Sequence, residues 1–258
     1  MAAVLRSRGR AIAWLLFFTL VLTAWWVMFA MATGSGLAPF AMAVRGDMGM
    51  DMAAESMPTR TFGVLFVMWA IMMLAMMGPT FVPTLSSYDA LIRAGHASRN
   101  GWAGLTVGFF LAWFAFAGLI SAVQAALQTR HVLDMMGMAT ASWLQGSLLV
   151  AVGAYQFTRT KDICQGVCLS PTVYFLTRWR PGFRGGVRLG AGLGGFCVAC
   201  CWGFMVLGFV GGTMNLIWMG LATVVMILEK LPEIAAFVTK PIGVVLALTG
   251  VLLLIGVV

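Results

Sequence analysis

Charged residues are scarce in this sequence: they make up 9% of its 258 residues, whereas hydrophobic residues make up 61%. A soluble domain carries about 25% charged residues, so this composition excludes the ordinary soluble class. Apolar runs of about 18 residues or more recur along the chain and are typical of membrane-spanning helices. Together with a mean hydropathy of +0.97, they predict an all-α, polytopic transmembrane bundle that forms a single domain over residues 1–258.

Histidine is almost absent. His96 and His131 are the two histidines, and both are predicted in loops on opposite sides of the membrane. This excludes a bis-histidine haem, a three-histidine zinc site and a histidine-rich copper oxidase centre within one chain. No nucleotide-binding glycine loop is present, and no Ser/His/Asp set can be assembled. The ligands available in quantity are sulfur, in 20 Met and 5 Cys, and thioether and thiolate sulfur favours Cu(I).

Acidic residues are outnumbered: there are 8 Asp and Glu against 16 Lys and Arg, which gives a net charge of +8. The excess does not indicate a nucleic-acid partner, because the basic residues lie between apolar runs, where they orient a membrane protein. Arg6, Arg8 and Arg10 precede an apolar run too long for a cleaved signal sequence, so this run is predicted to remain as the first span.

Seven spans are predicted, at about 11–32, 62–84, 102–127, 139–157, 187–210, 213–229 and 241–258. With a cytoplasmic N-terminus, all Lys and Arg residues except Arg45, Arg60 and Arg130 fall on the cytoplasmic side. This bias is the positive-inside rule, and an odd number of spans places the C-terminus outside. Glycines in the third predicted span, among them Gly104 and Gly108, predict close helix packing.

The most unusual stretch is Val67–Pro83, in which five methionines fall within ten positions. At about 100° per residue they cover roughly half of a helix circumference; they are Met68, Met72, Met73, Met76 and Met77. Pro79 and Pro83 are predicted to bend or end this helix. Methionine is an adaptable packing residue, but such a face can also bind a soft metal.

Two predicted loops carry further candidate ligands. In the outer loop at 33–61, Asp47, Met48, Met50 and Asp51 suit capture of copper, unless methionine is incidental in a weakly structured segment. In the basic cytoplasmic loop at 158–186, Cys164 and Cys168 lie four residues apart, one helical turn, close enough to share a metal. Cytoplasmic thiols stay reduced, so a disulfide is not expected there.

The fifth predicted span contains Cys197, Cys200 and Cys201 within about 100° of helical arc, and Met205 continues the same line. A single buried cysteine is often only a small hydrophobe, but three on one face aligned with a methionine favour metal binding. In the sixth span Glu229 is a costly carboxylate at the inner boundary. Either it pairs with Lys230 or an inside arginine, or it is a hard or proton-handling group beside the sulfur cluster.

Several segments together resemble a bacterial family of predicted metal-binding integral membrane proteins: MWAIMMLAMMGPTFVP, GAYQFT, CQGVCLSP, RWRPGFRGG and CCWGFMVLGFVGGTMNLIWM followed by EK. The resemblance covers roughly residues 60–232. It implies metal binding in a multi-pass protein of the bacterial inner membrane, without naming a reaction.

Three functions remain open at this level. The first is a membrane protein that captures, holds or transfers Cu(I) through its Met and Cys ligands. The second is a copper-dependent membrane oxidoreductase, monooxygenase-like, or a subunit of one, with Asp47, Asp51 or Glu229 as harder ligands or proton carriers. The third is a metal-free structural partner, in a homo-oligomer or a larger membrane complex, whose Gly- and Met-rich faces are helix contacts.

Overall fold

The computed structural model describes residues 2–33, 62–134, 137–213 and 215–256. Over these residues the chain forms helices and no strand, apart from a single antiparallel bridge between Leu133 and Ala139. The predicted all-α class is confirmed. The helices are α1 (Ala2–Thr33), α3 (Phe62–Arg93), α4 (Arg99–Thr129), α5 (Ser142–Tyr155), α6 (Arg159–Leu169), α7 (Pro171–Arg178), α8 (Gly182–Val206), α9 (Gly208–Gly211), α10 (Leu216–Leu228) and α11 (Ala235–Leu254).

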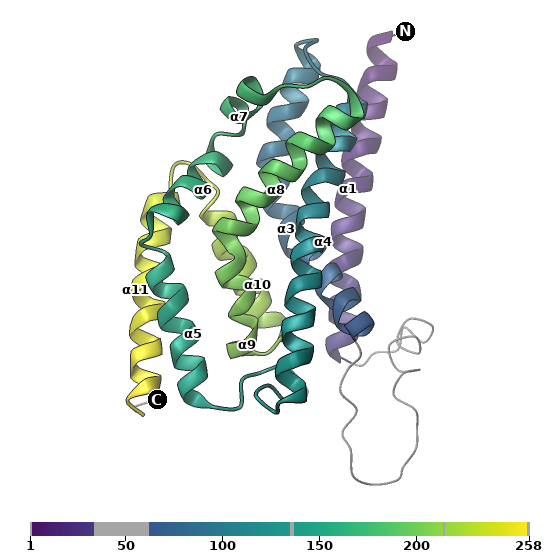
Figure 1. Cartoon of the computed structure of the whole chain (residues 1–258). Helices are drawn as coiled ribbons and strands as arrows, with labels where there is room; N and C mark the ends of the chain where they lie inside the picture. The colour runs from purple at the N-terminus through teal and green to yellow at the C-terminus, as the bar shows by residue number, and fades with distance from the viewer. Residues whose placement is uncertain (1, 34–61, 135–136, 214, 257–258) are drawn as a thin grey trace, which may run out of the picture.

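The long helices lie side by side along one axis (Figure 1). The helices α1, α3, α4 and α8 form one side of the bundle, α5 and α11 pair on the other side, and α10 lies between the two groups. The chain begins at one end of the bundle and finishes at the opposite end (Figure 1). This end-to-end course agrees with an odd number of passes along the bundle.

In the part of the chain that the structure describes, five helices are long and apolar enough to cross a membrane: α1, α3, α4, α8 and α11. The two other predicted spans correspond to α5, with 14 residues, and α10, with 13 residues. A helix of 14 residues is about 21 Å long, shorter than a hydrocarbon core of about 30 Å. Beyond α5 the chain continues in the same direction through α6 and α7 (Figure 1), so three short helices together run the length of the bundle. The segment predicted as a basic cytoplasmic loop is therefore largely helical.

Pro79 and Pro83 do not end the second predicted span, because α3 continues through both to Arg93. Proline lacks an N–H, so Pro79 leaves the carbonyl of Ala75 without its partner within the helix. The indole N–H of Trp25 on α1 donates to this carbonyl at 2.9 Å. A side chain from a neighbouring helix thus replaces the missing bond and fastens α1 to α3.

Glycines bring α4 and α8 into backbone contact. A methyl group at Gly104 would collide with the carbonyl oxygen of Phe183, and one at Gly108 with the carbonyl oxygen of Val187. From the other side, a methyl group at Gly190 would collide with the carbonyl oxygen of Leu105. Such close approach is the packing that small residues allow in membrane helices, and it fixes the depth of the cysteines on α8.

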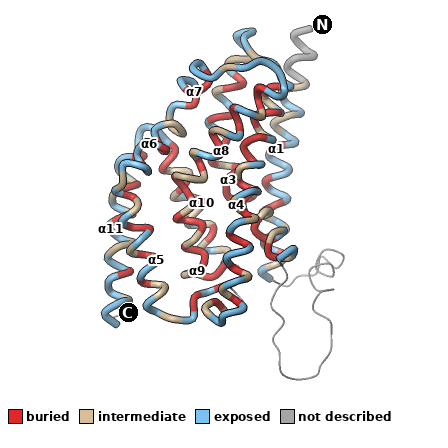
Figure 2. Tube along the Cα trace, in the orientation of Figure 1, coloured by how far each residue is buried: buried red, intermediate tan, exposed pale blue. Residues whose placement is uncertain are grey.

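Buried residues are concentrated on the faces of α3, α4 and α8 that point into the bundle, whereas much of α1, α5 and α11 is exposed (Figure 2). Many of the exposed side chains are large and apolar, such as Leu16 at 67% and Phe237 at 80% exposure. This distribution suits contact with lipid rather than with water.

Candidate metal centre

Three cysteine thiols meet where α6 packs against α8. Cys197 and Cys200 lie one turn apart on α8, and Cys168 lies in the last turn of α6. The three sulfur atoms lie within 4.8 Å of one another, and the Sγ atoms of Cys168 and Cys200 are 4.0 Å apart. We call these three residues the thiol cluster. An ion midway between sulfurs 4 Å apart would lie about 2 Å from each, close to the metal–thiolate distance of about 2.3 Å known for zinc.

Local sequence explains why α6 stops at the thiol cluster. The side chain of Thr158 caps its first turn by accepting a hydrogen bond from the backbone N–H of Lys161 at 3.3 Å. At the other end Pro171 begins α7, and the residue before a proline avoids the helical conformation. Ser170 accordingly lies outside it, with φ −125° and ψ 59°. Cys168 is thereby held just before a break in the chain.

The two remaining cysteines differ in their relation to the cluster. The Sγ atom of Cys201 lies 3.2 Å from that of Cys200, so Cys201 adjoins the cluster. Cys164 is buried, but it does not belong to the group of sulfurs within 4.8 Å. We expected Cys164 and Cys168 to share a metal on the cytoplasmic side. Instead, Cys168 joins the cysteines of α8, and Cys164 lies one turn, about 6 Å, before Cys168 on α6.

A buried lysine contacts the thiol cluster directly. The Nζ atom of Lys230, just after α10, lies 2.8 Å from the Sγ atom of Cys197 and 3.4 Å from the Oγ1 atom of Thr80. Its side chain also lies over the ring of Phe109. A positive charge at this position stabilises negative charge on sulfur, and thiolate is the form of cysteine that binds metals.

A second buried lysine is paired with Glu229. The Nζ atom of Lys161 donates to Glu229 Oε2 at 2.7 Å and to the carbonyl oxygen of Cys200 at 2.8 Å. Gln165 Nε2 donates to the backbone carbonyl of Glu229 at 2.8 Å. The expected partner of Glu229 was Lys230 or an arginine, so the partner in the structure, Lys161, was not anticipated.

Lys161 and Lys230 count among the orienting charges of the predicted cytoplasmic segments, but their side chains make contacts inside the bundle. Both are buried, Lys161 completely. A pattern that identifies the α6 face is nevertheless present. Lys161, Gln165 and Cys168 follow the i, i+4, i+7 spacing of one helical face, and each of them contacts α8 or the segment after α10.

All five methionines of the second predicted span point into the bundle: Met68, Met72, Met73, Met76 and Met77 are at most 5% exposed. Two small cavities, each of about 10 Å³, lie beside them and share Met72 and Met219. Such a volume holds about one water-sized occupant. The methionines that line these cavities form what we call the methionine column: Met28, Met31, Met68, Met72, Met76, Met205 and Met219.

The column leads toward the thiol cluster along α8. Met205 is four residues, or about 6 Å, from Cys201 on one helical face, and Cys201 contacts Cys200. Met77 approaches from α3, since its Sδ atom lies 3.8 Å from the Oγ1 atom of Thr80, which is itself beside Lys230. The candidate ligands of the outer loop, Asp47, Met48, Met50 and Asp51, lie outside the described residues.

Among the described residues, the thiol cluster is the one set of three or more His, Cys, Asp or Glu side chains arranged to hold a metal ion. No curated protein and no solved structure matches the chain. The family model of PpoB2, a copper chaperone family, matches residues 66–253, which include the thiol cluster and most of the methionine column. The chain belongs to this copper chaperone family.

Proposed function

We propose that this chain is an integral membrane carrier of Cu(I) that binds the ion at the thiol cluster and passes it to an acceptor protein. The observation that carries the proposal is the convergence of Cys168, Cys197 and Cys200 within 4.8 Å from two different helices. Soft thiolate ligands select Cu(I). Membership of the copper chaperone family supports a role in handling copper.

The charges around the cluster support the binding of a monovalent ion. If two of the three cysteines bind as thiolates and the third as a neutral thiol, the Cu(I) complex carries one net negative charge, which is costly in a medium of low dielectric constant unless it is balanced. The ammonium group of Lys230 lies 2.8 Å from Cys197 Sγ and supplies that balance. The charge of Lys161 is already matched by Glu229 at 2.7 Å, so of these two buried lysines Lys230 is the one available to balance the complex.

We propose that the methionine column is the path by which Cu(I) reaches the thiols. It begins near the end of α1, where Met28 and Met31 line one of the two small cavities. It continues through Met72, which lines both cavities, to Met205 in the other. Neutral thioethers bind Cu(I) more weakly than thiolates do, because they bring no charge. The ion would therefore move from weaker to stronger sulfur ligands.

The topology of the proposal has seven passes with a cytoplasmic N-terminus in the bacterial inner membrane. Five passes are the long apolar helices, the sixth is α10, and the seventh is the series α5, α6 and α7. Support comes from the opposite positions of the two chain ends (Figure 1) and from the basic residues near the end that holds the N-terminus. In this orientation the methionine column opens on the outer side.

One observation favours the alternative of a copper-dependent oxidoreductase. The Oε1 atom of Glu229 is buried and, within the described part of the chain, has no hydrogen-bond partner. Such an oxygen can accept a proton during a reaction. However, Glu229 is engaged by Lys161 and is not among the side chains that could share a metal ion with the cysteines. The ligands of the thiol cluster are all sulfur, which favours carriage over oxygen chemistry.

The test is Cu(I) binding by the purified full chain in lipid nanodiscs, under anaerobic and reducing conditions, in competition with a chromogenic Cu(I) chelator. We expect about one tightly bound copper per chain. Replacement of Cys168, Cys197 or Cys200 by serine should remove tight binding, because each change takes away one soft ligand. Cys164→Ser is the matched control, since it replaces a buried thiol on the same helix as Cys168 that lies outside the cluster.

Tight copper binding that survives the three cluster substitutions would refute the proposal. Equal loss of binding in Cys164→Ser would refute it as well, because the effect would then not depend on the cluster. Copper-dependent consumption of oxygen by the purified wild-type protein would instead support the oxidoreductase.

A further inference from the structure

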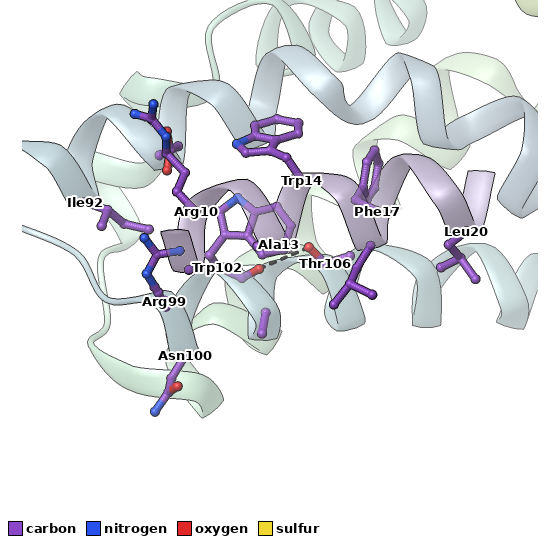
Figure 3. A pocket seen from close by; sticks show the side chains of 14 residues that line it. Arg10, Ala13, Trp14, Phe17, Leu20, Ile92, Arg99, Asn100, Trp102 and Thr106 are labelled. Carbon is purple, nitrogen blue, oxygen red and sulfur yellow. Dashed lines mark hydrogen bonds and ion pairs between the residues drawn. The ribbon is translucent and has the colours of Figure 1, made fainter. Parts of the chain in front are cut away.

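A cavity of about 440 Å³ lies between α1, the first turns of α4 and the end of α3. Its two ends differ in character (Figure 3). Arg10, Arg99 and Asn100 line one end, whereas Phe17 and Leu20 line the other. The cavity therefore offers cationic and hydrogen-bonding groups at its head and an apolar channel behind them.

The head of the cavity carries excess positive charge. Asp89 is the acidic residue that lines it. The carboxylate of Asp89 lies 4.0 Å from the guanidinium of Arg10 and 3.9 Å from that of Arg93. Two arginines and one carboxylate thus line this end, and that carboxylate is also shared with Arg93, outside the lining. The excess favours an anionic occupant, and arginine is the side chain best suited to bind phosphate.

The dimensions of the cavity match one leaflet of a bilayer. Arg10 and Leu20 are ten residues apart on α1, or about 15 Å, which is half of a hydrocarbon core of about 30 Å. Trp14 and Trp102 lie near the head of the cavity, with ring centroids 5.9 Å apart, and tryptophan is enriched where a helix crosses the membrane interface. Arg10 and Arg99 lie at the ends of the apolar segments of α1 and α4, where a spanning helix meets the lipid head groups.

We propose that this cavity binds one anionic glycerophospholipid. Its phosphate would lie against Arg10 and Arg99, and one acyl chain would follow Phe17 and Leu20. The site stands apart from copper binding, because none of its lining residues belongs to the thiol cluster or the methionine column. The lipid fills the space between α1 and α4 and fastens α1 to the rest of the bundle.

Native mass spectrometry of the full chain tests this, after equilibration with equal amounts of phosphatidylglycerol and phosphatidylcholine that carry the same acyl chains. We expect one retained lipid, with phosphatidylglycerol preferred by about 30-fold, the factor for two arginines at about 1 kcal/mol each. Equal retention of the two lipids, or retention of neither, would overturn the proposal.

Three variants locate the site. Arg10→Gln combined with Arg99→Gln should abolish the preference, while Arg184→Gln, which removes an exposed arginine from the start of α8, should leave it unchanged. Ala13→Phe should lower retention of either lipid by filling the cavity while both arginines remain. A preference that persists in the double variant, or that Arg184→Gln removes equally, would contradict the assignment. Size-exclusion elution and helical circular dichroism identify any variant that has not folded, and Ala13→Phe tests the site without removing charge.

Discussion

The ammonium group of Lys230 lies 2.8 Å from the thiol sulfur of Cys197, inside the bundle and away from water. An uncompensated ion at such a position is costly, so the lysine and the sulfur depend on each other for charge balance. The contact connects the end of α10 to the middle of α8. Under the proposed function, it would make the affinity for copper depend on a residue that need not touch the metal.

Replacing Lys230 by leucine, which removes the charge without adding a sulfur ligand, should weaken Cu(I) binding by about 10- to 100-fold, the usual effect of losing a group that supports a metal ligand. Lys230→Arg keeps the charge and should retain most of the affinity. The measurement is competition with a Cu(I) chelator. If Lys230→Leu bound copper as tightly as the wild type, the charge-balance argument would fail.

Lys161 and Glu229 should contribute to the free energy of unfolding only when both are present. Lys161→Met leaves a buried carboxylate without its partner, and we expect a loss of about 3 to 5 kcal/mol in the free energy of unfolding. The double variant with Lys161→Met and Glu229→Leu should recover most of this loss, because neither charge is then buried. Thermal unfolding of the single and double variants in nanodiscs measures the coupling. Additive losses would show that the two residues act independently.

Methionine column residues should control the rate of copper loading more than the final affinity. Met72→Leu keeps the volume of the side chain but removes a thioether shared by the two cavities. We expect loading to slow by about tenfold, the factor for 1.4 kcal/mol lost from a transient site. Met73→Leu is the matched control, because Met73 is equally buried but lines neither cavity. The measurement is the rate of copper loading of each reduced variant in nanodiscs, followed by stopped flow. Equal loading rates for Met72→Leu and Met73→Leu would exclude the column as the path.

The glycines at the contact between α4 and α8 should not be replaceable by larger residues without a loss of stability. In Gly190→Val the added group would meet the carbonyl oxygen of Leu105, and we expect a loss of about 1 to 3 kcal/mol or more from overpacking. Gly195→Val on the same helix is the control, because a methyl group there meets no atom within 4 Å. The temperature at which each variant leaves the monodisperse peak in size-exclusion chromatography gives the comparison. Similar temperatures would show that the close approach does not limit stability.

Patterns within single helices were readable from the sequence. The period of 3.6 residues placed Cys197, Cys200 and Cys201 on one face of α8 and the five methionines on one broad face of α3. All of these side chains are buried. A prediction from a single residue was less reliable. Pro79 does not end α3, because Trp25 from another helix donates to the carbonyl that the proline leaves free.

By itself, then, the sequence determined the class of the protein and the softness of its candidate ligands, since apolar composition and sulfur content need no knowledge of contacts. Only the tertiary structure decided that Cys168 rather than Cys164 joins the thiols of α8, that Lys161 holds Glu229, and that Lys230 lies against Cys197. The physical reason is that helical periodicity fixes angle and height within one helix. The packing of different helices, here set by the glycines of α4 and α8 and by the break before Pro171, decides which faces meet and at what depth.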